Sequence, residues 1–324
     1  MLDGPNRTHP KRGLRARTLR VCAVCAAAAV AASLVACSPT GPPSRTQDPS
    51  VRAAPPALGP PQGERQGRGA MLARALKPLM PDGDTRLAVA VFDLDSADQE
   101  VASYGAKDSF VTASISKLGI LAALLLQAQD EDRALTAAER GYAEEMIRTS
   151  DNEAANSLWQ SIGEAVGLDA AHERLGLEAT KGGPGTSWGL TRTTARDQVQ
   201  LLRAVFARGP VSTPRPPKGL NQASRAYIRR LMGQITDEQD WGVSAAGSPG
   251  DQWALKNGWI QRNTTGLWVI NSVGQVTVHG HHYLVSVLSS GNPSMESGVK
   301  LVERAARAAI GAASAHVRPW PGKP

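Results

Sequence analysis

The chain has 324 residues, of which 41% are hydrophobic and 20% are charged. These proportions fit one large or two modest globular domains and exclude a fibrous or wholly disordered protein. The formal net charge is +7, but residues 1–36 carry six cations against only Asp3, which leaves about +2 for the rest of the chain. The later basic residues are interspersed with acids, so nucleic acid is not expected as a partner.

The first 36 residues have the features of a targeting segment. A basic stretch ends at Arg20, and the apolar run Val21–Ala36 that follows is short for a membrane-spanning helix of about 20 residues. The run ends in Leu34-Val35-Ala36-Cys37, which resembles the lipobox of bacterial lipoproteins. We expect residues 1–36 to be a signal peptide and Cys37 to be lipidated, anchoring the protein to the outer face of the cell membrane. The alternative is ordinary signal-peptidase cleavage near Ala36.

Cysteine usage gives no redox or metal motif. Cys22 and Cys25 have C-x-x-C spacing but lie inside the alanine-rich apolar run, and Cys37 is the only other cysteine. We therefore expect the mature domain to be stabilised by its core without disulfides.

Residues 37–68 are predicted to be a tether. Eight prolines between Pro39 and Pro61 fall among Ser, Gly, Thr and Ala, and such a segment cannot bury enough apolar surface to fold. The globular domain is predicted to cover 69–315.

The predicted elements of that domain follow one another as a helix, two strands, a long helical stretch, three strands and a final helix. Their ranges are Met71–Leu79 (helix), Arg86–Phe92 and Glu100–Tyr104 (strands), Ser114–Gln129, Thr136–Thr149, Asn152–Ile162, Leu168–Leu175, Thr194–Ala207 and Ser224–Ile235 (helices), Trp253–Trp259, Leu267–Val273 and Tyr283–Ser289 (strands), and Met295–Ile310 (helix).

This order predicts an α+β fold. Both groups of strands are expected to form one antiparallel five-stranded sheet flanked by helices, with an all-helical lobe inserted. The sheet lobe would comprise about 69–108 and 236–315, and the helical lobe about 109–235. A functional site is expected at the seam between the two lobes.

Ser114 and Lys117 open the most apolar helix of the domain. Residues three apart share a helix face, so the hydroxyl and the amine can meet. Burial disfavours an ammonium ion, and a neutral amine can accept the serine's proton. The helix N-terminus favours an oxyanion beside the serine. Alone, the S-x-x-K pattern is equally explained by an ordinary serine at a helix start.

Two further triplets have simple structural explanations when taken singly. Ser150-Asp151-Asn152 lies between two predicted helices, where it fits a helix N-cap. Lys256-Asn257-Gly258 lies within a strand pattern, where it fits an edge lysine beside a glycine. Their joint order with S-x-x-K is what indicates a catalytic constellation.

This constellation resembles the class A β-lactamases and related penicillin-recognising serine hydrolases, whose signature is S-x-x-K, S-D-N and K-T-G. The resemblance spans about Met71–Ile310. It also includes Phe110 before the serine, the run Ser150–Asn156 (S-D-N-E-A-A-N) and the run Thr193–Asp197 (T-T-A-R-D). It implies a β-lactamase-like fold.

The resemblance also implies roles for the reactive residues. Ser114 would be the acylated nucleophile, Lys117 its proton acceptor, and Ser150 part of the proton relay to the leaving group. Amide cleavage is then divided into acylation and hydrolysis, which needs no cofactor.

Substrate contacts follow from the same resemblance. Asn152 would bind the substrate amide and Lys256 its carboxylate. The backbone N–H groups of Ser114 and Trp259 would form the oxyanion hole. Asn257 replaces the usual Thr or Ser of K-T-G and can still donate to a carboxylate. The Trp259 side chain either fills part of the pocket or packs on the sheet.

Two departures concern the rest of the site. The segment between Lys117 and Ser150 is shorter than in typical class A enzymes, so walls of the site are expected to be missing. Between Leu177 and Thr193 there is no E-x-x-L-N, and Glu178, the only carboxylate there, falls early for a base that activates water. Without such a base an acyl-enzyme would form and persist.

The histidines near residue 280 and the tryptophans of the strand region are two further candidate binding features. His279, His281 and His282 cluster at a predicted hairpin turn and no Cys or carboxylate is expected to accompany them, so no metal is expected. The tryptophans of the strand region are expected to be core rather than carbohydrate-stacking residues.

Three functions therefore stay open. The protein is a lipid-anchored serine hydrolase that attacks β-lactams, a D,D-peptidase-like enzyme that acts on D-alanyl peptides of the cell wall, or a wall-binding lipoprotein without catalysis. The retention of five reactive groups favours an enzyme, which we expect to be a monomer.

Overall fold

The computed structural model describes residues 62–81, 83–97, 99–207 and 219–315. The predicted signal peptide, Cys37 and the tether up to residue 61 lie outside the described residues. Helix α1 (Gln62–Leu76) begins inside the range predicted as tether. Its first turns are polar and contain Gly63, Gly67 and Gly69, so they show no apolar periodicity.

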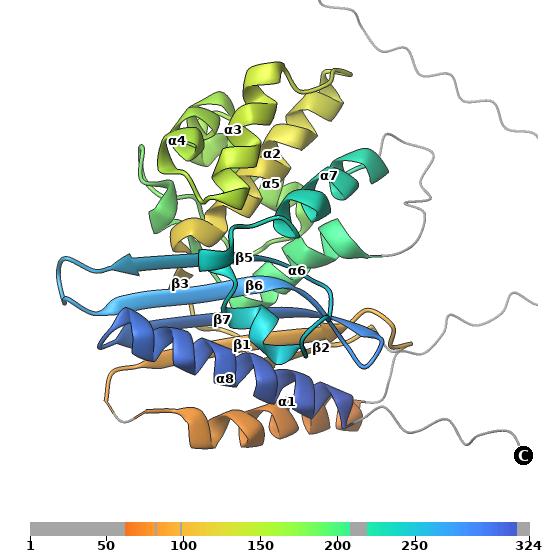
Figure 1. Cartoon of the computed structure of the whole chain (residues 1–324), viewed down its shortest axis with the longest axis vertical. Helices are drawn as coiled ribbons and strands as arrows, with labels where there is room; N and C mark the ends of the chain where they lie inside the picture. The colour runs from red at the N-terminus through yellow and green to blue at the C-terminus, as the bar shows by residue number, and fades with distance from the viewer. Residues whose placement is uncertain (1–61, 82, 98, 208–218, 316–324) are drawn as a thin grey trace, which may run out of the picture. The chain divides into compact units, whose positions relative to one another are not determined.

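One antiparallel sheet with strand order β2–β1–β7–β6–β5 forms the centre of the domain (Figure 1). The strands are β1 (Arg86–Asp93), β2 (Val101–Tyr104), β5 (Trp253–Gln261), β6 (Trp268–Val278) and β7 (His281–Asn292). Strand β1 pairs with β7 over its whole length, from Arg86 opposite Ser290 to Asp93 opposite Tyr283. The predicted closure of the two strand groups into one sheet is confirmed.

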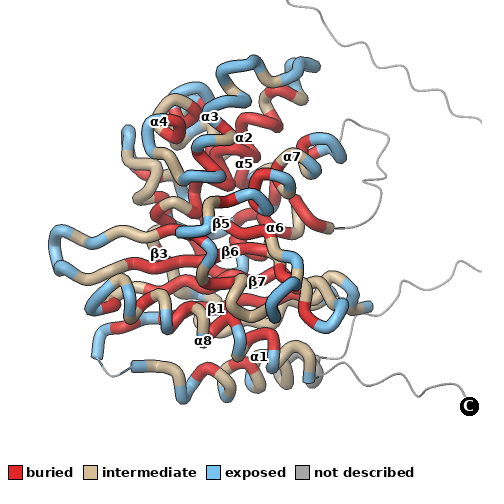
Figure 2. Tube along the Cα trace, viewed as in Figure 1, coloured by how far each residue is buried: buried red, intermediate tan, exposed pale blue. Residues whose placement is uncertain are grey.

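Helices cover both faces of the sheet. Helix α1 and helix α8 (Met295–Ser314) pack on one face, and α6 (Ala195–Phe206) and α7 (Gln222–Met232) pack on the other. The central strands are buried between these layers (Figure 2). The predicted mixture of helices and an antiparallel sheet is therefore confirmed.

The helical lobe is organised around α2 (Ser116–Asp130). Twelve of its fifteen residues are buried, which matches a helix that is apolar on all sides. Around it lie α3 (Ala137–Arg148), α4 (Asn152–Ser161) and α5 (Glu164–Leu175). Helix α3 begins with a capping box between Thr136 and Glu139.

Short elements connect these helices and strands. They are η1 (Lys77–Leu79), β3 (Phe110–Val111), η2 (Ala113–Ile115), η3 (Trp188–Leu190), β4 (Arg192–Thr193), η4 (Asp237–Gln239) and η5 (Gly242–Ala246). Strands β3 and β4 pair with each other as a small second sheet. Within the described ranges, no helix combines the length and the hydropathy needed to cross a membrane.

Candidate active site

Ser114 lies in the single turn η2, between β3 and α2, rather than in the first turn of the helix itself. The residue before it, Ala113, has a φ of 48°, a left-handed conformation that is costly for a residue with a Cβ. The turn is attached to the sheet by the buried Asn271, whose Nδ2 donates to the carbonyls of Val111 and Thr112, both at 2.9 Å. Oδ1 of Asn271 accepts from the backbone N–H of Ser289. Asn271 therefore holds the serine's turn in position, a role that sequence reasoning missed.

Strand β5 approaches the same turn at Gly258. A Cβ on this glycine would lie 2.8 Å from the backbone nitrogen of Ser114 and 2.7 Å from that of Ile115. Only glycine permits this approach of two backbones. The contact brings the strand that carries Trp259 to the serine. The oxyanion pair formed by the N–H groups of Ser114 and Trp259 stays a prediction.

Lys117 is fully buried one helical turn beyond Ser114. Its Nζ donates to the carbonyl of Ser150 at 2.6 Å, to the hydroxyl of Ser150 at 3.1 Å and to Oδ1 of Asn152 at 2.9 Å. Burial lowers the pKa of Lys117 from 10.5 to about 7, although the carboxylate of Asp151 opposes this shift. A substantial fraction of Lys117 is therefore neutral near pH 7 and able to accept a proton.

Lys256 reaches the same hydroxyl from the sheet. Its Nζ donates to Oγ of Ser150 at 2.9 Å and to the carbonyl of Asn257 at 3.0 Å. Complete burial lowers the pKa of Lys256 well below its ordinary value, and the neighbouring charge of Lys117 lowers it further. The Ser150 hydroxyl accepts from both amines, so its own proton is available to a third group.

The S-D-N segment begins α4 and presents two of its side chains to Lys117. Ser150 has a φ of 59°, and Asp151 is the N-cap, with its carboxylate accepting from the N–H of Ala154 at 2.7 Å. The helix cap and the lysine contacts therefore coexist: Asp151 starts the helix, and Ser150 and Asn152 on either side of it contact Lys117.

Asn257 and Trp259 do not present their side chains to this site. Successive side chains of a strand point to opposite faces, and these two lie on the face away from Lys256. Nδ2 of Asn257 donates to the carbonyls of Gln239 and Trp241, and the residue is 1% exposed. The prediction that the Asn257 amide contacts a substrate carboxylate is therefore wrong. The amide N–H groups already donate to two backbone carbonyls, and the side chain is buried.

The Trp259 ring packs edge-to-face on Trp241 with ring centroids 6.0 Å apart. The Trp259 side chain therefore packs on the sheet and does not fill part of the pocket. Only the backbone of Trp259 remains available to the site.

The segment between Leu177 and Thr193 places an indole beside the reactive lysine. Nζ of Lys117 lies 4.7 Å from the ring centroid of Trp188, and Nε1 of Trp188 donates to Oδ1 of Asn156 at 2.8 Å. Glu178 is exposed and lines a separate cavity of about 620 Å³ with Val166 and Asp169. The sequence gives no sign of this role for Trp188, because only the folded loop brings its ring to Lys117 and its N–H to Asn156.

A cleft of about 770 Å³ adjoins the reactive groups. The start of α4, the 186–190 segment and the hairpin between β5 and β6 form its walls. Its lining residues include Asn152, Trp188, Ile260 and Arg262. The cleft is open to an elongated substrate that carries both polar and apolar groups.

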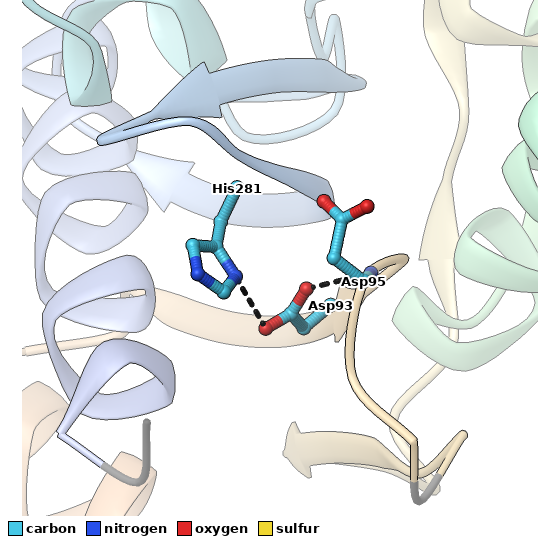
Figure 3. Close-up of side chains that lie close together, drawn as sticks. All are labelled: Asp93, Asp95 and His281. Carbon is cyan, nitrogen blue, oxygen red and sulfur yellow. Dashed lines mark hydrogen bonds and ion pairs between the residues drawn. The ribbon is translucent and has the colours of Figure 1, made fainter. Parts of the chain in front are cut away.

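A separate group of possible metal ligands lies at the end of β1 (Figure 3). One donor atom each from Asp93, Asp95 and His281 lie within 4.8 Å of one another. The expectation that no carboxylate accompanies the histidines is corrected, because the pairing of β1 with β7 brings both aspartates to them. Nδ1 of His281 is 3.4 Å from Oδ2 of Asp93, and Nδ1 of His282 is 2.8 Å from Oδ2 of Asp95.

Comparison with known proteins assigns the chain to one family. Residues 140–313 match the model of the β-lactamase enzyme family. No curated protein matches the sequence.

Solved structures share the fold. The TLA-1 extended-spectrum β-lactamase superposes with a TM-score of 0.64 at 15% identity, over 76% of this chain and 99% of its own. A class A β-lactamase from Bacteroides cellulosilyticus DSM 14838 gives 0.63 at 15% identity, over 76% and 99%. A mutant of PBP-A in an acyl-enzyme complex with penicillin G gives 0.60 at 22% identity, over 81% and 100%.

Proposed function

Because the chain belongs to the β-lactamase enzyme family, we propose that it is a serine hydrolase that forms a covalent acyl-enzyme on Ser114. Family membership supports hydrolase activity in general. The titles of the similar structures, which include β-lactamases and a penicillin G acyl-enzyme of PBP-A, favour β-lactams or related peptides as substrates.

The observation that carries the proposal is that the buried amines of Lys117 and Lys256 share the Ser150 hydroxyl, while β5, which carries Lys256, lies against the backbone of Ser114 at Gly258. In acylation, Oγ of Ser114 attacks the amide carbonyl carbon while Lys117 accepts its proton. The negative charge on the carbonyl oxygen is stabilised by the predicted pair of N–H groups. The hydroxyl of Ser150 gives its proton to the leaving nitrogen and receives the proton held by Lys117 in its place, and the C–N bond breaks.

Lys256 has two tasks in this scheme. In the free enzyme its lowered pKa favours the neutral amine, which passes protons with Ser150. A substrate carboxylate nearby would stabilise the ammonium form and raise that pKa again. The predicted attraction between Lys256 and a carboxylate therefore develops as the substrate binds.

Release of the acyl group is proposed to be slow. Water attack on the ester is faster when a carboxylate or another base activates the water, and the segment 177–193 presents an indole to Lys117. This arrangement favours a penicillin-binding, D,D-peptidase-like enzyme over an efficient β-lactamase. Lipid anchoring through Cys37 at the outer face of the cell membrane would place it beside cell-wall peptide.

Intact-mass spectrometry during incubation with penicillin G tests the proposal. We expect a lasting mass increase equal to the drug, absent from Ser114→Ala. A transient adduct with accumulating hydrolysed drug would instead indicate a working β-lactamase. The absence of any adduct, also with a D-alanyl-D-alanine peptide, would contradict the proposal.

A further inference from the structure

Trp188 is held in place by several independent contacts. Its indole N–H donates to Asn156 at 2.8 Å, and its ring lies on Nζ of Lys117 at 4.7 Å from the centroid. The next residue, Gly189, lies against the serine's turn, because a Cβ there would be 3.9 Å from Cα of Ala113. The N–H of Thr112 donates to the carbonyl of Thr191 at 2.8 Å. The loop that carries the indole is thereby joined to the turn that carries the nucleophile.

The same side of the cleft offers little to activate water. Asn156 uses its Oδ1 for the indole, and Glu153 is the only acid among the described residues that line the cleft. Glu153 is exposed, and its Oε1 accepts from Nδ2 of Asn156 at 3.4 Å. The Trp188 ring thus lines the cleft and at the same time lies on the buried amine of Lys117.

We propose that Trp188 determines the fate of the acyl-enzyme, because its ring, fixed by Asn156, excludes from the Lys117 side the water that would hydrolyse the ester. The inference rests on the proposed function. In the step that it slows, the oxygen of water bonds to the ester carbonyl carbon, the bond from that carbon to Oγ of Ser114 breaks, and the proton returns to Oγ. Excluding water from a site protects such reactive intermediates from hydrolysis.

The test compares acylation and release separately. The full chain and its variants are loaded with penicillin G, free drug is removed, and the adduct is followed by intact mass. We expect Trp188→Ala to release the acyl group about tenfold faster than the native chain, without faster acylation. Trp188→Phe keeps an apolar ring but loses the N–H that donates to Asn156. Trp188→Phe and Asn156→Ala should therefore both release the acyl group at rates between those of the native chain and Trp188→Ala.

Controls separate this effect from a general loosening of the fold. Tyr142→Ala removes a half-exposed aromatic ring from α3 and should leave release unchanged. Melting temperatures are measured for every variant, and Glu153→Gln in the Trp188→Ala background shows whether that acid activates the admitted water. If Trp188→Ala does not fold, Trp188→Phe and Asn156→Ala still give the comparison.

The outcomes distinguish the inference from the proposed function. Release that is equally slow in the native chain and in Trp188→Ala overturns the inference alone, as does equal acceleration in Trp188→Ala, Trp188→Phe and Tyr142→Ala. Failure of the native chain to form any adduct overturns both.

Discussion

The two sides of the cleft differ in chemistry. The side made by the start of α4 leads to the two buried amines of Lys117 and Lys256, which the half-buried hydroxyl of Ser150 joins. The opposite side, made by the 186–190 segment, presents an indole and a glycine backbone. In the proposed mechanism, a site can therefore keep the groups that form an acyl-enzyme while the groups that hydrolyse it are replaced, because different sides of the cleft serve the two steps.

The strongest test of this difference between the two sides is to remove the amine of Lys117. Lys117→Met should lower the acylation rate by about 10²–10⁴-fold, because it removes the proton acceptor of Ser114 while retaining an unbranched apolar stem. Stopped-flow mixing with a fluorescent penicillin measures the rate. Lys300→Met, on the exposed face of α8, is the matched control; unchanged acylation in Lys117→Met would exclude Lys117 as the base.

The pH dependence of acylation should report the same amine. Neutral Lys117 is the reactive form, and its pKa is lowered to about 7 by burial, with Asp151 opposing the shift. The rate should therefore fall about tenfold per pH unit below 7 and level off above it. An acylation rate that is constant from pH 5 to 8 would contradict this assignment.

Gly258→Ala should impair acylation next most strongly. Its Cβ would overlap the backbone nitrogens of Ser114 and Ile115, and a displacement of the nucleophile by about 1 Å can cost about 10²-fold. Gly311→Ala in α8, where a Cβ meets nothing within 4 Å, is the control. Near-native acylation in Gly258→Ala would show that the turn tolerates movement.

Asn271→Ala should have a smaller effect on rate and a clear effect on stability. It leaves the carbonyls of Val111 and Thr112 without their donor, at a cost of about 1–3 kcal/mol in the free energy of unfolding. Urea denaturation measures this loss. Asn271→Asp, which has the same shape but no amide donor, should lose about as much; full stability in both variants would remove the positioning role.

The smallest expected effect concerns Glu178. Because it lies exposed in a separate cavity, Glu178→Gln should change acyl release by less than about twofold, within the usual range of surface substitutions. A large decrease in release would mean that Glu178 reaches the ester.

The sequence predicts the sheet well and also singles out Lys117, Ser150, Asn152 and Lys256, which contact one another in the structure, because local patterns encode both. Alternation and turn residues mark the strands, and Ser114, Lys117, Ser150 and Lys256 lie in recognisable triplets. The orientation of Asn257 follows from the same alternation: once Lys256 faces the helical lobe, its neighbour on the strand faces away.

The opposite side could not be predicted, because its contacts depend on distant parts of the chain. The indole of Trp188 contacts Asn156 and Lys117 only after the loop folds back. The sequence around Asn271 indicates only a strand, and its contacts with the turn that carries Ser114 form only when β6 packs against that turn. The carboxylates beside His281 likewise depend on the register of β1 against β7.

The contacts that Gly258 and Asn271 make with the turn that carries Ser114 have a consequence for biosynthesis. A nascent chain that ends near residue 250 already contains Ser114, Lys117 and Ser150, but it lacks Lys256, Gly258 and Asn271. Strand β1 also pairs with β7, which is far later in the chain. The sheet is therefore completed by long-range pairing after most of the chain has been made. The turn that carries Ser114 therefore gains these contacts only after about the last quarter of the polypeptide has been translated and folded.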